Sequence, residues 1–279
     1  MTEKPVDEGF DLIIEPRRTT ADFIRELIHY RELFFFLAWR DIIVRYKQTA
    51  VGVLWSVIRP LLSMVIFTLV FGRVARLPND GVPYPILVYS AMLPWQYFSS
   101  ALGTSANSLI NGAPLVSKIY FPRLILPTSS ILANVVDFLI SFVLLCLLML
   151  LYRFMPSSRI VMLPVFFLPA TLTALGFGYW FSALGVKYHD FQFIVPFMLQ
   201  LGLFISPVGF SSSVIPERLR LLYSLNPMVG VIDGFRWCIQ GTIELYLPGV
   251  FFSAVISLLV FFSGIAFFRR IERSLADFI

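Results

Sequence analysis

The sequence carries little charge for its length. Only 14% of its 279 residues are Asp, Glu, Lys or Arg, whereas a typical soluble domain has about 25%. Hydrophobic residues make up 58% of the chain, and 29 residues are Phe. So few charged side chains could not cover a soluble fold that also had to bury this much apolar area. The shortage of charge therefore excludes an ordinary soluble domain.

Cysteine and histidine are also scarce. The two cysteines, Cys146 and Cys238, cannot form a disulfide framework. His29 and His189 stand alone, with no HExxH sequence and no cysteine cluster beside them. The sequence therefore predicts no metal site.

The few lysines exclude one class of enzyme. A P-loop needs Lys directly after Gly, because the backbone N–H groups and the Lys together hold the phosphates. None of the four lysines follows a glycine, which excludes ATP hydrolysis by that route. The acidic loop pairs that membrane glycosyltransferases place around a metal and a diphosphate are absent as well. We expect this chain to be no enzyme and to bind no cofactor itself.

The sequence does contain long charge-free runs. They cover residues 81–117, 124–136, 138–152, 160–186, 191–216 and 245–268. A helix needs about 20 residues to cross a hydrocarbon core of about 30 Å. Four runs exceed that length, and the two shorter ones are separated only by Asp137. These runs account for five spans, and the apolar stretch at about 52–72, which contains Arg59, adds a sixth. We expect an all-α polytopic membrane protein with six transmembrane helices, at about 52–72, 84–103, 124–152, 160–186, 191–211 and 248–268.

The basic residues indicate the orientation of these spans. Six spans put both termini on one side of the membrane. Apart from Arg59, 14 basic residues lie in segments on the side of the termini and seven in the opposite loops. Because Lys and Arg are enriched in cytoplasmic loops, we expect both termini in the cytoplasm. The net charge of +5 reflects this topology, so no nucleic-acid partner is expected.

The chain before the first span divides into two parts. Residues 1–29 are predicted to form a polar cytoplasmic segment, and residues 30–48 are too charged to cross a membrane. One arc of about 120° on a helical wheel holds Phe35, Phe36, Trp39, Ile42, Ile43 and Tyr46. This pattern predicts an amphipathic helix in the membrane interface, or alternatively a helix packed on a soluble partner. Residues 49–279 then form the transmembrane domain.

The segment between the fifth and sixth spans is too long for a tight turn. Prolines divide it into two stretches, 217–225 and 228–241, each too short to cross the membrane. We expect two short re-entrant or interfacial helices, with a break that lies beside protein or water. Asn226, Pro227 and Met228 form this break and are candidates for an extracytoplasmic gate. The alternative is a loop that only connects two spans.

One acid, Asp137, lies inside a predicted span. An acid within the membrane is a candidate for ion-coupled transport. The interpretation we prefer is a carboxylate that is hydrogen-bonded to a neighbouring helix, because no Lys or His partner is evident.

Several stretches together resemble a known family. They are RDIIVRYKQT (40–49), GVLW (52–55), RPL (59–61), LPWQYFSS (93–100), LVSKIYFPR (115–123), YSLNPM (223–228) and GFRW (234–237). In order and position they resemble bacterial polysaccharide-export permeases, the membrane subunits of type-2 ABC exporters. The resemblance is greatest to O-antigen permeases and extends to capsule and teichoic-acid permeases.

The resemblance implies a transporter that works with partners. Members of the family export a polysaccharide on a polyprenyl diphosphate lipid across the bacterial inner membrane. They act as a homodimer with two copies of a separate ATPase subunit, which binds ATP and Mg²⁺. The family's coupling helix, which docks on the ATPase, matches Leu115, Val116, Ser117, Lys118, Ile119, Tyr120 and Phe121. An interfacial turn that rests on lipid is the alternative for this segment.

Two further groups of residues are candidates for substrate contacts. The basic residues that could recognise the lipid diphosphate are Arg40, Arg45, Lys47 and Arg59. The aromatic residues that could line a sugar channel between two copies are Trp55, Trp95, Tyr97, Phe98 and Trp180. For any single one of them, membership of the interfacial aromatic belt is the alternative.

Other functions stay open at this point. A small-molecule ABC exporter and a secondary transporter or channel that works alone both agree with the apolar runs. The sequence does not identify the sugar, nor does it separate O-antigen from capsule or teichoic acid.

Overall fold

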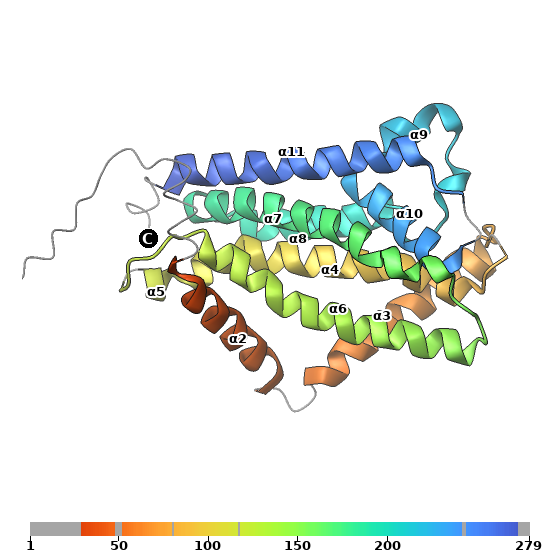
Figure 1. The fold of residues 1–279 in the computed structure, drawn as a ribbon, viewed down its shortest axis with the longest axis horizontal. Coiled ribbons are helices and arrows are strands. Elements are labelled where there is room, and N and C mark those ends of the chain that lie inside the picture. The colour runs from red at the N-terminus through yellow and green to blue at the C-terminus, as the bar shows by residue number, and fades with distance from the viewer. Residues whose placement is uncertain (1–28, 48–51, 80, 117, 242–243, 273–279) are drawn as a thin grey trace, which may run out of the picture.

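The computed structural model describes residues 29–47, 52–79, 81–116, 118–241 and 244–272. Every regular element within these residues is helical, and none is a strand. Figure 1 shows a bundle of long helices that run mostly along the longest axis of the molecule. The predicted all-α class is therefore confirmed.

Four segments are long and apolar enough to cross a membrane: Leu54–Val74, Ile125–Leu151, Ser158–Lys187 and Leu247–Glu272. They correspond to the first, third, fourth and sixth predicted spans. The first consists of α3 (Gly52–Phe67) and its π-helical continuation η1 (Thr68–Val74). The second is α6 (Ile125–Leu151), and the third is the 3₁₀ turn η2 (Ser158–Met162) followed by α7 (Leu163–Lys187). The fourth is α11 (Leu247–Glu272).

The fifth predicted span is shorter than expected. Helix α8 (Phe191–Ile205) has 15 residues, which is about 22 Å at 1.5 Å per residue and less than a hydrocarbon core. The prediction of a helix as far as residue 211 is therefore wrong. Ser206 is extended and precedes Pro207, and a residue before proline is pushed out of the helical region.

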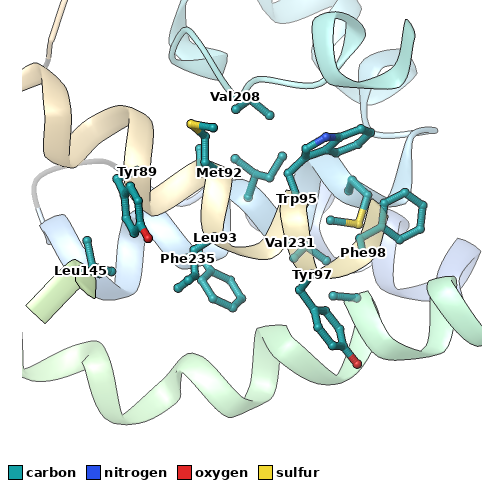
Figure 2. Packing of buried hydrophobic residues seen from close by; sticks show 14 of the residues in the cluster. Tyr89, Met92, Leu93, Trp95, Tyr97, Phe98, Leu145, Val208, Val231 and Phe235 are labelled. Carbon is teal, nitrogen blue, oxygen red and sulfur yellow. The ribbon is translucent and has the colours of Figure 1, made fainter. Parts of the chain in front are cut away.

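Helix α4 (Tyr84–Asn111) is the central element of the bundle. It packs against α6, α7 and α10 (Pro227–Gln240), and one whole stretch, residues 86–95, is buried. Figure 2 shows Met92 and Leu93 of α4 near Val208 and Phe235 in this core. The helix also carries many Ser, Thr, Asn and Gln residues, and it is not among the four strongly apolar spans. A count of six spans therefore stays a prediction.

Helix α2 (Arg31–Lys47) lies across α6 at the side of the bundle (Figure 1). Leu37 and Ala38 are its buried residues. Phe35, Phe36 and Trp39 are each more than half exposed. These three residues of the predicted aromatic face point away from the bundle, whereas Ile42 and Tyr46 are partly buried. The position of this face in a membrane interface stays a prediction.

Two short helices follow α8, as predicted. They are α9 (Glu217–Tyr223) and α10, and the chain breaks between them before Pro227. Helix α10 lies inside the bundle, because α4, α7 and α11 pack around it. Its Arg236 is one of the seven basic residues that the sequence analysis assigned to loops opposite the termini. The residue is only 1% exposed. The guanidinium donates to the carbonyl oxygens of Phe210 at 2.7 Å and Val208 at 3.1 Å.

Helices α7 and α11 approach each other through glycine. A methyl group added at Gly264 would lie 2.4 Å from the carbonyl oxygen of Gly176. Small residues allow this close approach between helices in a membrane. The contact fixes α11 against the rest of the bundle.

Replacement of Gly264 by Ala should therefore destabilise the protein by overpacking, by about 1–3 kcal/mol. The measurement is thermal unfolding of the purified chain in detergent. Gly185→Ala in α7 is the matched control, because its added methyl would meet Ile110 Cδ1 at an ordinary 3.5 Å. Equal unfolding temperatures for the two variants would contradict this account of the α7–α11 contact.

Candidate polar cavity at the junction of four helices

A cavity of about 750 Å³ lies where α2 and α3 meet α4 and α6. Its charged lining residues are Arg45, Arg59 and Asp137. Serines and threonines of α3, α4 and α6 supply hydroxyl groups, and Trp55, Trp95 and other aromatic residues supply flat apolar faces. The cavity thus combines net positive charge with aromatic surface.

The carboxylate of Asp137 is the centre of the polar contacts. It forms an ion pair with the guanidinium of Arg45 and accepts a hydrogen bond from the hydroxyl of Tyr46. The hydroxyl of Ser56 also donates to Asp137 Oδ1, at 3.1 Å. These donors come from α2 and α3, so one acid of α6 connects three helices.

Asn134, one turn earlier on α6, adds the fourth helix. Its Oδ1 accepts hydrogen bonds from Arg45 Nη1 at 3.0 Å and Ser100 Oγ at 2.8 Å. Its Nδ2 donates to Thr104 Oγ1 at 2.8 Å and to the carbonyl oxygen of Ser130 at 3.0 Å. An amide side chain has two donor hydrogens and two acceptor lone pairs, so the hydrogen-bonding capacity of this fully buried Asn is satisfied.

The environment of Tyr46 keeps its hydroxyl protonated. Burial, together with the hydrogen bond to the Asp137 carboxylate, raises the pKa of Tyr46 to about 12. At neutral pH the phenol is therefore a donor to Asp137 and not a competing negative charge.

The hydrogen bonds expected in the preferred interpretation of Asp137 are confirmed, because its carboxylate accepts from residues of neighbouring helices. That it takes no part in ion-coupled transport stays a prediction. The sequence reasoning missed Arg45 as the ionic partner. The two residues are 92 positions apart, and no local spacing in one sequence connects them. Arg45 therefore differs from Arg40, which is exposed and pairs with the adjacent Asp41 at 2.8 Å.

The four candidates for diphosphate recognition thus separate into two pairs. Arg45 and Arg59 line the cavity. Arg40 and Lys47 are exposed on α2 and do not line it. In the part of the chain that the structure describes, Arg59 forms no hydrogen bond or ion pair.

The aromatic candidates separate in the same way. Trp55, Trp95 and Tyr97 line the cavity. Phe98 lies in the core beside Trp95, at 5.5 Å between ring centroids (Figure 2). Trp180 stacks on the Phe267 ring of α11 at 4.1 Å and does not line the cavity.

The predicted coupling segment is a short helix, α5 (Ala113–Val116), followed by a turn. Ile119 and Tyr120 are more than half exposed, whereas Phe121 is buried in a cluster that includes Leu37 of α2. Ser117 lies outside the described residues. Leu115 and Val116 are half-buried and Lys118 is exposed. Phe121 therefore anchors the segment, and Ile119 and Tyr120 provide its accessible apolar surface.

The predicted gate residues begin α10. Asn226 Oδ1 accepts a hydrogen bond from the backbone N–H of Met228 at 3.0 Å, and its Nδ2 donates to Ser206 Oγ at 2.9 Å. Pro227 occupies the first helical turn, where its missing N–H is harmless. The Met228 side chain is only 1% exposed, so it faces the interior of its own chain. A gating role for this break stays a prediction.

A second polar pocket, of about 310 Å³, lies beside this break and was not foreseen from the sequence. Ser211–Ser213, Arg220, Tyr223 and Asp233 line it. Ser212 Oγ donates to Asp233 Oδ1 at 2.6 Å. Among the residues that the structure describes, no group of three or more His, Cys, Asp or Glu is arranged to hold a metal ion.

Replacement of Asn134 by Leu should destabilise the junction by about 1–3 kcal/mol, because it leaves buried polar groups without their partner. Thermal unfolding in detergent measures the loss. Ser99→Ala is the control, since Ser99 lines the same cavity and makes no hydrogen bond within the described residues. An N134L variant as stable as S99A would contradict the role of Asn134 in joining α2, α4 and α6.

Comparison with known proteins agrees with this architecture. An O-antigen export system permease protein of Myxococcus xanthus, RfbA, is 32% identical over 217 residues, which cover 76% of this chain and 82% of that protein. The Klebsiella pneumoniae protein of the same name is 27% identical over 251 residues, 88% of this chain and 94% of its own length. The polysialic acid transport protein KpsM of Escherichia coli is 23% identical over 248 residues, 85% of this chain and 92% of its own length.

A family model confirms the resemblance that the motifs indicated. The model for ABC-2 type transporters matches residues 32–239, from the start of α2 to the last turn of α10. This range includes the cavity, the α5 segment and the break before α10. The chain belongs to the ABC-2 type transporter family of membrane permeases.

Proposed function

We propose that the chain is the membrane subunit of an ABC exporter that moves a polyprenyl-diphosphate-linked polysaccharide, of the O-antigen type, across the bacterial inner membrane. The observation that carries the proposal is the cavity at the junction of α2, α3, α4 and α6, with Arg45, Arg59 and several aromatic rings in its wall. Guanidinium groups are suited to phosphate, and aromatic faces to the C–H faces of sugars. The names of the relatives support this substrate class.

The transported unit presents its charge at one point, the diphosphate between lipid and sugar. Arg45 and Arg59 are the candidates for contact with it, because both line the cavity. Arg40 and Lys47 are exposed on the same side of the junction and would attract the headgroup at longer range. Trp55, Trp95 and Tyr97 would contact sugar. Phe98 would pack against the Trp95 ring and hold it in place.

Two copies of the chain are needed for a continuous path. Residues of α3 line the cavity, and Leu62, Val65 and Ile66 of the same helix are about half exposed. A second copy beside this face would close the cavity into a channel, as expected for a homodimer with closed symmetry. Helices α9 and α10, which flank the break, lie toward the end of the bundle opposite α5 (Figure 1), and we assign the break at Asn226 and Pro227 to the extracytoplasmic gate.

ATP hydrolysis is assigned to a separate subunit that binds ATP and Mg²⁺. Figure 1 shows α5, the start of α2 and the end of α11 at one end of the bundle, which supports a cytoplasmic position for both termini. Arg123 connects these parts, since its backbone N–H donates to Glu272 Oε1 at 3.1 Å. The exposed Ile119 and Tyr120 would then dock on the ATPase.

The resemblance to KpsM favours one second candidate, a capsule polysaccharide as the cargo. Family membership disfavours a secondary transporter or channel that works alone. A teichoic-acid permease and a small-molecule ABC exporter are the remaining alternatives, and they differ from the proposed function in the transported cargo. Analysis of the polysaccharide that accumulates in cells without the chain would identify the cargo.

Replacement of Tyr120 by Asp should release the ATPase subunit, because the docked surface would have to bury an unpaired carboxylate at a cost of several kcal/mol. Co-purification of the ATPase with the tagged chain measures the contact. Tyr188→Asp, in the loop after α7, is the matched control with a similarly exposed Tyr. Full recovery of ATPase with Y120D would remove α5 and its turn from the coupling role.

Replacement of Arg59 by Gln should slow export and cause lipid-linked polysaccharide to accumulate inside the cell, because one of the two cationic partners in the cavity is lost. We expect a loss of about tenfold in rate, the effect of roughly 1.4 kcal/mol. The assay compares surface polysaccharide with the lipid-linked pool. Arg73→Gln is the control, because Arg73 is an exposed residue at the far end of the same span and lies outside the cavity. Equal export by R59Q and R73Q would exclude Arg59 from substrate recognition.

A further inference from the structure

The two cations of the cavity are held differently. Arg59 has no polar partner among the described residues. Arg45 is paired with Asp137, which is the one carboxylate among the described residues that line the cavity. One positive charge is thus neutralised inside the empty cavity, and the other is not.

Anchoring of α2 does not by itself require the charge of Asp137. Asn134 already accepts a hydrogen bond from Arg45 and binds α4 as well. A carboxylate within a strongly apolar helix is costly to place in a membrane. Asp137 adds hydrogen bonds from Tyr46 and Ser56, which a neutral acceptor could also receive. What its charge adds is neutralisation of Arg45.

The pair is placed where an anion could reach it. The side chains of Arg45 and Asp137 are 28% and 25% exposed, and both line the cavity. A diphosphate carries more negative charge than a carboxylate and binds guanidinium groups through several oxygens. It can therefore replace Asp137 as the partner of Arg45, whereas an anion with a single charge gains much less.

Asp137 would not be left without partners after such an exchange. The hydroxyls of Tyr46 and Ser56 both donate to its Oδ1. These two hydrogen bonds do not involve Arg45 and can remain when Arg45 moves away. The cost of separating the ion pair is thereby reduced.

We propose that Asp137 is an exchangeable counter-ion that makes the cavity selective for diphosphates. In the empty cavity it neutralises Arg45. When a diphosphate enters, Arg45 leaves Asp137 and binds the phosphate together with Arg59. Single-charge anions, such as ordinary phospholipid headgroups, are rejected because their binding does not compensate for loss of the Arg45–Asp137 ion pair. The selectivity is the difference between the affinities for the two kinds of anion. This inference rests on the proposed function of the cavity and assigns its selectivity to one residue.

Ligand binding by the purified full chain in lipid nanodiscs tests the exchange, with the fluorescence of the cavity tryptophans as the signal. The probes are geranylgeranyl diphosphate, geranylgeranyl methyl phosphate (a phosphodiester with a single negative charge) and inorganic pyrophosphate. Wild type should prefer the lipid diphosphate to the lipid phosphodiester. Asp137→Asn should bind the phosphodiester about tenfold more tightly than wild type, so that most of the preference is lost. If inorganic pyrophosphate binds as tightly as geranylgeranyl diphosphate, the exchange is supported, but the source of the diphosphate is not a lipid.

A double-mutant cycle separates exchange from a purely structural pair. Arg45→Gln should weaken binding of the lipid diphosphate about tenfold and lower the unfolding temperature, because Asp137 loses its charge partner. The double variant R45Q/D137N should regain the unfolding temperature of wild type but should still bind the lipid diphosphate weakly. Recovery of both would overturn the proposal, and this cycle also decides the matter if the single D137N variant does not fold.

The same measurements distinguish failure of this inference from failure of the proposed function. If wild type binds the diphosphate lipid and D137N keeps the full preference over the lipid phosphodiester, only the role of Asp137 is overturned. If wild type binds none of the three probes and R59Q exports normally, the cavity is not a headgroup site, and both proposals are overturned.

Discussion

The cluster of polar contacts around Asp137 and Asn134 is what the rest of the site depends on. It joins α2, a helix that lies across the bundle, to the middle of a long apolar helix. Without a partner, an acid at that depth would be strongly unfavourable. Because Arg45 and Tyr46 come from α2 and Ser56 from α3, the same carboxylate determines where both helices lie. The position of α3 in turn places Trp55 and Arg59 in the wall of the cavity.

Helix α4 shows how a polar surface is maintained inside an apolar bundle. One part of it is packed in the hydrophobic core, as Figure 2 shows around Met92 and Leu93. The following turns place Ser100 and Thr104 on Asn134, where each hydroxyl finds a partner and therefore does not destabilise the interior. The proposed headgroup site needs such a wall, since a uniformly apolar surface would give a charged headgroup nothing to bind. Under this proposal, the most central helix is not one of the most apolar because it supplies that wall.

Much of the fold could be predicted from the sequence, because apolar runs and proline breaks act locally. The four strongly apolar spans and the break before Pro227 follow from run length and from proline geometry. The length of α8 was missed because the effect of Pro207 on Ser206 was not considered. The partnership of Arg45 with Asp137 could not be predicted, since it depends on tertiary packing between residues far apart in the chain. Burial of Met228 and Arg236 was missed for the same reason: it depends on α4, α7 and α11 surrounding α10.

The central claim is that this permease receives a diphosphate headgroup between α2, α3, α4 and α6. The most direct test is an experimental structure of the dimer with its ATPase and a bound polyprenyl-diphosphate glycan. The account predicts density for the diphosphate between Arg45 and Arg59, with the Arg45 guanidinium no longer paired to Asp137. A headgroup bound elsewhere, with the Arg45–Asp137 pair intact and the cavity filled only by water, would contradict it.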